Sequence, residues 1–92
     1  MKFHIVKVVE VSQLRGYCLR VAFSDGSIGE HDFSGLFDEP GPMIEPLRDP
    51  AFFSRVFVEM GALAWPNGFD MDAIKLHMDM TAAGELKRDA AE

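Results

Sequence analysis

Hydrophobic and polar residues follow two strand-like patterns in the first quarter of the chain. Residues 3–11 are rich in Val and Ile and carry apolar side chains on both alternating faces, which predicts a strand in the interior of a sheet. Residues 17–23 place an apolar side chain at every second position, which predicts a half-buried strand. Both segments therefore indicate β structure.

A tight turn follows the second strand at Ser24-Asp25-Gly26-Ser27. Asp-Gly between two alternating runs is typical of a two-residue hairpin of type I′. This turn would pair Phe23 with Ile28 and Arg20 with His31 across two antiparallel strands.

A segment rich in proline and glycine comes next. Residues 35–46 contain two glycines and three prolines, which excludes a central strand and a long helix. Apolar side chains are frequent there, so we expect the segment to lie across the core as a lid. These side chains are Leu36, Phe37, Met43, Ile44 and Leu47. Asp49-Pro50 then has the residue types of an N-cap and a first helical position, which predicts a short helix.

The last third of the chain predicts two more strands and a terminal helix. The strands cover residues 56–59 and 62–65, with Met60-Gly61 as their turn. The helix covers residues 70–80, with Asp70 as its N-cap and with Met71, Ile74 and Met78 on one stripe.

The order of these elements predicts an α+β fold. It has a small antiparallel sheet of about five strands, a short helix after the proline-rich lid, and a terminal helix. Residues 1–80 form a single domain in this prediction. Residues 81–92 contain one large apolar residue, Leu86, and are expected to form a flexible or frayed helical tail.

The charge of the chain restricts its partners. The formal net charge of the 92 residues is −6 and the pI is about 4.9, with no basic run. Direct nucleic-acid binding is disfavoured because phosphate contacts need a positive surface, and a basic protein is an easier partner. The single cysteine, Cys18, cannot form an internal disulfide, and no apolar run resembles a membrane span or a Sec-type signal. Cytoplasm is the expected location.

Candidate catalytic and metal-binding residues do not converge in the sequence. His31 and Asp32 are adjacent on a strand and point to opposite faces, while His77 and Asp79 diverge on a helix. We therefore expect no catalytic, cofactor or metal site, and we favour a protein that is not an enzyme.

Two residues remain open to two interpretations each. Trp65, which opens the turn Trp65-Pro66-Asn67-Gly68, fits the core of a small domain or an exposed anchor for a partner. Arg48 fits a structural ion pair with Asp32 or Asp70, or the recognition of a ligand.

Several of these pieces, taken in order, resemble one known family. They are Phe23-Ser24-Asp25-Gly26, Asp32, Gly41-Pro42, Pro46-Leu47-Arg48-Asp49-Pro50, Phe53, Trp65-Pro66-Asn67-Gly68 and Asp70. The chain is similar to the small bacterial family called domain of unknown function 2442. The resemblance implies a compact α+β domain without an established activity. It also implies a gene beside another small gene, in an arrangement like a toxin–antitoxin pair.

The leading hypothesis is a non-enzymatic cytoplasmic interaction module, the acidic partner in such a gene pair, which binds a small basic protein. Its expected surface consists of Arg48, Trp65, Asn67, Phe69, Asp70 and Met78. The alternative is a small-ligand-sensing or regulatory domain that acts with a separate DNA-binding protein. An exposed apolar patch at the methionines would also suit a homodimer.

Overall fold

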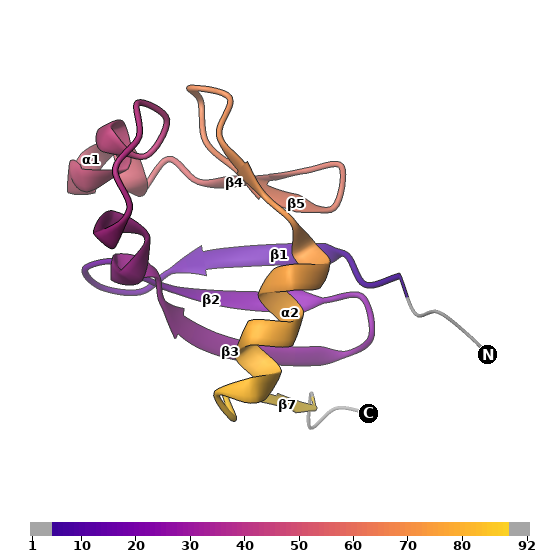
Figure 1. Ribbon diagram of the computed structural model, residues 1–92. Helices are drawn as coiled ribbons and strands as arrows, with labels where there is room; N and C mark the ends of the chain where they lie inside the picture. The colour runs from indigo at the N-terminus through magenta and orange to yellow at the C-terminus, as the bar shows by residue number, and fades with distance from the viewer. Residues whose placement is uncertain (1–4, 89–92) are drawn as a thin grey trace.

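The computed structural model describes residues 5–88, and it confirms an α+β fold (Figure 1). Within these residues, three strands are followed by three short helices, three more strands, a longer helix and a last strand. In order, the elements are β1 (Val8–Gln13), β2 (Cys18–Phe23), β3 (Ser27–Asp32), the 3-10 helices η1 (Phe33–Asp38) and η2 (Glu45–Arg48), α1 (Pro50–Phe53), β4 (Phe57–Glu59), β5 (Ala62–Ala64), β6 (Asp70–Met71), α2 (Ala73–Ala82) and β7 (Leu86–Arg88).

The strands form two antiparallel sheets, of four strands in the order β1-β2-β3-β7 and of three in the order β4-β5-β6. The prediction of an interior strand over residues 3–11 was wrong in bounds and position. Strand β1 covers Val8–Gln13 and lies at the edge of its sheet. Residues 3 and 4 lie outside the described part of the chain. The backbone N–H of Val8 donates to the carbonyl of Gly61 at 2.8 Å, so β1 connects the two sheets.

The first hairpin has a different register from the predicted one. Phe23 and Ser27 end the two strands, which leaves a three-residue loop closed by a 3.1 Å hydrogen bond from the Gly26 N–H to the Phe23 carbonyl. Gly26 alone in this loop has a positive φ, of 89°, as expected for a type I turn followed by a left-handed residue. The prediction of a type I′ turn was wrong, and Arg20 therefore faces Glu30 instead of His31.

The lid, residues 33–48, contains the two 3-10 helices and packs at one end of the larger sheet (Figure 1). The Tyr17 hydroxyl donates to the Arg48 carbonyl, and the Tyr17 ring makes an edge contact with Phe37 at 4.7 Å between centroids. Asp49 accepts a hydrogen bond from the Ala51 N–H at 3.1 Å, which confirms the predicted cap and the short helix α1.

Helix α2 crosses the face of the larger sheet (Figure 1). It begins at Ala73, because the Asp72 carboxylate accepts a hydrogen bond from the Ile74 N–H at 3.1 Å and caps the helix. Asp70, the predicted cap, lies in β6 instead. The predicted apolar stripe was also wrong, since the side chains that α2 buries are Ala73, Leu76 and Met80.

The chain does not end in a frayed helix within the described residues. Gly84, with a φ of 73°, reverses the chain, and Leu86–Arg88 add strand β7 beside β3. Gly29 allows this close approach, because a Cβ atom there would lie 2.3 Å from the Glu85 carbonyl oxygen. The tail prediction was therefore wrong for residues 86–88, and residues 89–92 lie outside the described part.

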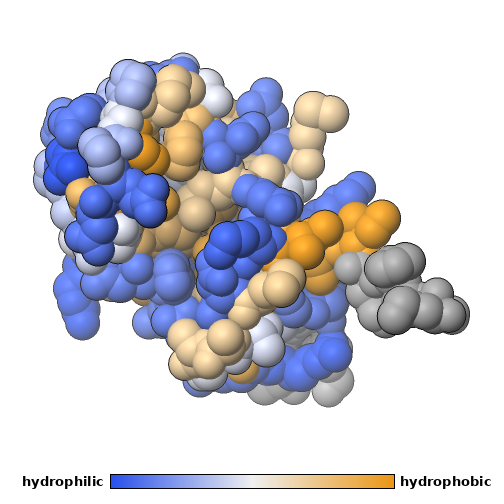
Figure 2. Space-filling model, viewed as in Figure 1, coloured by the Kyte–Doolittle hydropathy of each residue, from blue (hydrophilic) through white to orange (hydrophobic). Residues whose placement is uncertain are grey.

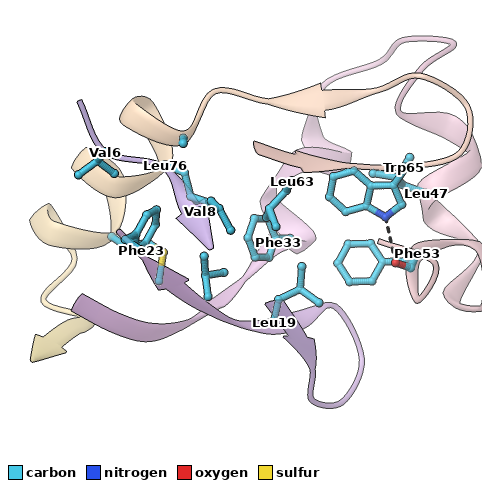
Figure 3. Packing of buried hydrophobic residues seen from close by; sticks show 13 residues of the cluster. Val6, Val8, Leu19, Phe23, Phe33, Leu47, Phe53, Leu63, Trp65 and Leu76 are labelled. Carbon is cyan, nitrogen blue, oxygen red and sulfur yellow. Dashed lines mark hydrogen bonds between the residues drawn. The ribbon is translucent and has the colours of Figure 1, made fainter. Parts of the chain in front are cut away.

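One hydrophobic core lies between the larger sheet, the lid and the other helices and strands (Figure 3). Strand β2 contributes Leu19, Val21 and Phe23 from alternate positions, as its pattern predicts. The rest comes from β1, the lid, α1, β5 and α2, and the fully buried large side chains include Phe33, Phe53, Leu47, Leu63 and Leu76.

Candidate interaction surface

Trp65, the most prominent residue of the predicted surface, lies in the core. Its side chain is 1% exposed, and its indole N–H donates to the Phe53 carbonyl at 2.9 Å (Figure 3). The rings of Phe53 and Phe69 lie at 5.7 Å from it between centroids. The core interpretation is therefore confirmed, and Trp65 offers no exposed surface to a partner.

The loop after Trp65 is a tight hairpin that holds the lid. Trp65 and Phe69 pair across Pro66-Asn67-Gly68, and Gly68 has a φ of 93°. The Asn67 amide nitrogen donates to the Met43 carbonyl at 3.0 Å, and its oxygen accepts from the Phe69 N–H at 3.2 Å. Asn67 therefore fastens the lid to the smaller sheet, which is a structural use of this side chain.

Arg48 has a structural role within the lid. Its guanidinium donates to the Glu45 carboxylate at 3.0 Å and to the Phe37 carbonyl at 2.7 Å, and it lies 5.2 Å from the centre of the Phe37 ring. The predicted ion pair with Asp32 or Asp70 was wrong in its partners, because the 3-10 turn brings Glu45 to the same side three residues earlier.

Met78 and Asp70 border a different surface, on the outer side of α2. Met78 is 63% exposed and lines a hollow with Val6 and Ile74, while Asp70 lines a second hollow with Ile5 and Met60. Val6 and Ile74 line both hollows, which makes the surface continuous. We call this surface the apolar patch, and its exposed members are Ile5, Met60, Ile74 and Met78. Figure 2 shows hydrophobic residues gathered between α2 and the start of the chain.

The predicted surface is therefore divided. Arg48 and Asn67 hold the lid, Trp65 is in the core, and only Asp70 and Met78 border the apolar patch. Met60 is 97% exposed in the turn between β4 and β5, where its φ is 52°.

A groove of about 470 Å³, which we call the lid groove, lies on the other side of α2. The lid and α2 form its walls, and Leu36, Ile44, Met71 and Leu76 supply apolar lining. Its charged lining residues are Asp32, Glu39, Asp79 and Lys75, and the His31 imidazole lies at its edge. The Ser34 N–H donates to Asp32 at 2.9 Å and lowers the pKa of that carboxyl, which keeps it ionised.

Two histidine–carboxylate pairs fasten the C-terminal segment to the first hairpin. His31 Nδ1 lies 2.7 Å from Glu85, and His77 Nε2 lies 3.0 Å from Asp25. Burial disfavours the charged form of Asp25, but hydrogen bonds from Ser27 and His77 outweigh burial and lower the pKa of this carboxyl. Each pair joins two elements far apart in the sequence, so both have a clear structural role.

The residue types that bind metals do not cluster in the described part of the chain. Among residues 5–88, no three His, Cys, Asp or Glu side chains lie close enough together to hold a metal ion. Cys18 is half-buried in β2.

Comparison with known proteins places the chain in a family. The family model described as "Protein of unknown function (DUF2442)" matches residues 8–78, which is more than half of the chain. The protein belongs to the DUF2442 family. No curated protein and no solved structure matches it.

The DUF2442 match covers both three-residue hairpins, the lid and the capped start of α2. Most of the lid groove lies within it, whereas Ile5 of the apolar patch and strand β7 lie outside. Within the described residues of this DUF2442 protein, no helix has the length and apolar character to cross a membrane.

The sequence prediction missed Ile5, Met60 and Ile74 as surface residues. One signal was present for Met60, because Met60-Gly61 was predicted as a turn and turn residues face solvent. The exposure of Ile74 was missed because the apolar stripe was predicted at Met71, Ile74 and Met78. The side chains that α2 buries are instead Ala73, Leu76 and Met80.

Proposed function

We propose that this DUF2442 protein is a non-enzymatic interaction module that binds a small basic protein, as the acidic member of a two-gene pair. The apolar patch is the observation that carries the proposal. Four large apolar side chains are exposed around one pair of connected hollows. Contiguous exposed apolar surface of this kind is typical of sites where another protein binds.

The composition of the patch suits an interface. Met60 and Met78 are flexible and polarisable, so they adapt to the shape of a partner. Asp70 and Asp72 lie at one rim of the patch and Lys7 lies beside them. A hydrophobic centre with charged residues at the rim is the usual anatomy of a protein–protein interface.

The charge of the chain favours a basic partner. With a net charge of −6, two copies of the chain repel each other at long range, whereas a positively charged protein is attracted. A homodimer is therefore less favoured than a complex with a basic protein, and the oligomeric state of the purified protein tests this choice.

Co-expression with the product of the neighbouring gene tests the proposal. We expect the two proteins to co-elute at low and at physiological salt. The double variant Ile74→Lys/Met78→Lys should weaken the complex by about tenfold or more, because it places charge in the centre of the patch. The single variant Met78→Lys should also weaken the complex, and Val9→Lys is its control of equal charge, since Val9 is 58% exposed but lines neither hollow. Failure of the wild-type pair to co-elute at low salt rejects the pairing.

A second function, the sensing of a small ligand for a separate DNA-binding protein, has the size of the lid groove in its favour. A volume of about 470 Å³ falls within the range of small-molecule sites. A thermal-shift screen against metabolites tests this function, because a ligand at 100 times its dissociation constant stabilises a protein by about 2.7 kcal/mol.

A further inference from the structure

We infer that the lid groove is a docking site for a positively charged segment of the partner protein, in which apolar side chains alternate with Lys or Arg. This inference rests on the proposed function, because it specifies how the basic partner is recognised. It concerns the side of α2 opposite to the apolar patch, so the two surfaces are tested separately.

The lining of the groove selects the chemistry of this segment. The apolar side chains Leu36, Ile44 and Met71 provide contacts for apolar side chains of the occupant. Around them are the carboxylates Asp32, Glu39 and Asp79, against a single ammonium, Lys75. A segment with both apolar and cationic side chains satisfies both parts of the lining.

The carboxylates are available to an occupant. Glu39 makes no ion pair within residues 5–88. Asp79 is paired with Lys75 at 2.9 Å, but these side chains are 53% and 72% exposed, and ion pairs so exposed to water are weak. The His31 imidazole is held by the Glu85 carboxylate at 2.7 Å, so this side chain is already engaged by a residue of the chain itself.

The groove is also held in shape before any partner binds. The Tyr17 hydroxyl holds one end of the lid at the Arg48 carbonyl, and Asn67 holds its middle at the Met43 carbonyl. Leu76 belongs to the buried face of α2, which fixes the opposite wall. A preformed site binds with less loss of conformational entropy.

Binding of a labelled synthetic peptide tests the inference without the natural partner. The probe is a fluorescein-labelled peptide in which Leu alternates with Lys, and its anisotropy is measured against the full chain. Matched peptides replace Lys with Glu, or Leu with Ser. We expect the Leu–Lys peptide to bind and both matched peptides to bind more weakly.

Variants with equal charge locate the binding site. The double variant Glu39→Gln/Asp79→Asn should weaken binding of the Leu–Lys peptide by about fivefold, while Glu10→Gln/Glu59→Gln should change it by less than about twofold. Glu10 and Glu59 are exposed and lie outside the groove lining. Ile44→Ser should also weaken binding of the Leu–Lys peptide. When the patch variant Ile74→Lys/Met78→Lys is also present, Glu39→Gln/Asp79→Asn should still weaken peptide binding more than Glu10→Gln/Glu59→Gln does.

The inference is overturned if the wild-type protein does not bind the Leu–Lys peptide, or if the two carboxylate variants weaken binding equally. It is also overturned if the peptide with Glu in place of Lys binds as tightly as the Leu–Lys peptide. Stabilisation by a metabolite that is lost in Ile44→Ser, without peptide binding, would assign the groove to a small ligand. If the neighbouring gene product does not co-elute but the Leu–Lys peptide binds, only the proposed pairing is rejected. If the gene product co-elutes but the peptide does not bind, only the inference about the lid groove is rejected.

Discussion

Replacement of Trp65 by Phe tests the placement of the indole in the core. The indole is 1% exposed and packs between the rings of Phe53 and Phe69, each at 5.7 Å. Phenylalanine keeps an aromatic ring in this position but removes the second ring and the N–H donor. The change therefore leaves the shape of the site largely intact while it creates a small cavity.

Two terms set the size of the effect. The smaller ring and the cavity cost about 1–2 kcal/mol. The lost hydrogen bond to the Phe53 carbonyl costs about 1 kcal/mol, at the low end of the usual range, because the Val56 N–H still donates to this carbonyl at 3.3 Å. The free energy of unfolding should fall by about 2–3 kcal/mol, and the Tm by about 10–20 °C.

Urea unfolding followed by circular dichroism measures this change, since the variant lacks a tryptophan. Phe57→Leu is the matched control, because Phe57 is 40% exposed and the free energy should change by less than about 0.5 kcal/mol. In the wild type, the fluorescence of Trp65 should shift to longer wavelength on unfolding. A Trp65→Phe variant within about 0.5 kcal/mol of wild type would refute the buried position of the indole.

Three further predictions concern local contacts. Gly29→Ala should lower the free energy of unfolding by about 1–3 kcal/mol and speed amide exchange at Leu86–Arg88, because its Cβ would meet the Glu85 carbonyl. Gly35→Ala is the control and should change the free energy little, because a Cβ at Gly35 would have nothing within 4 Å. Asp72→Ala should cost about 1 kcal/mol through loss of the α2 cap, and Asp70→Ala should cost less than about 0.5 kcal/mol; equal costs in urea unfolding would contradict the cap assignment. Asp25 has a lowered folded-state pKa, so its stabilising contribution is present above the ordinary value of 3.8 and is lost as pH falls through the folded-state pKa. The difference in unfolding free energy between wild type and Asp25→Asn should therefore shrink from pH 5 to pH 2, and a constant difference would contradict this reasoning.

Two features that local signals in the sequence determine were predicted correctly. Alternation along residues 17–23 predicted the buried face of β2, and Asp49-Pro50 predicted the cap of α1. These features depend on neighbouring residues, which the sequence displays directly. The α+β class followed from the order of such elements.

Features that depend on distant contacts were not predictable in the same way. Both Asp70 and Asp72 are acceptable caps, and the choice between them depends on the pairing of Asp70 with Ala64 in β6. Strand β7 has few apolar residues, and its place beside β3 depends on the missing Cβ of Gly29 and on the reversal at Gly84. The partner of Arg48 was missed because the 3-10 turn that presents Glu45 has no strong sequence signal.

The register of one hairpin shows how a local error alters the candidate surfaces. A two-residue turn would have paired Arg20 with His31, which would leave Glu85 without its partner. With the three-residue loop, Arg20 pairs with Glu30 at 2.9 Å, and His31 is free to hold Glu85 at 2.7 Å. That contact fixes the turn between α2 and β7 and occupies the imidazole at the edge of the lid groove. The carboxylates Asp32, Glu39 and Asp79 give the lid groove its acidic lining, and the hairpin register decides that His31, at its edge, is held by Glu85.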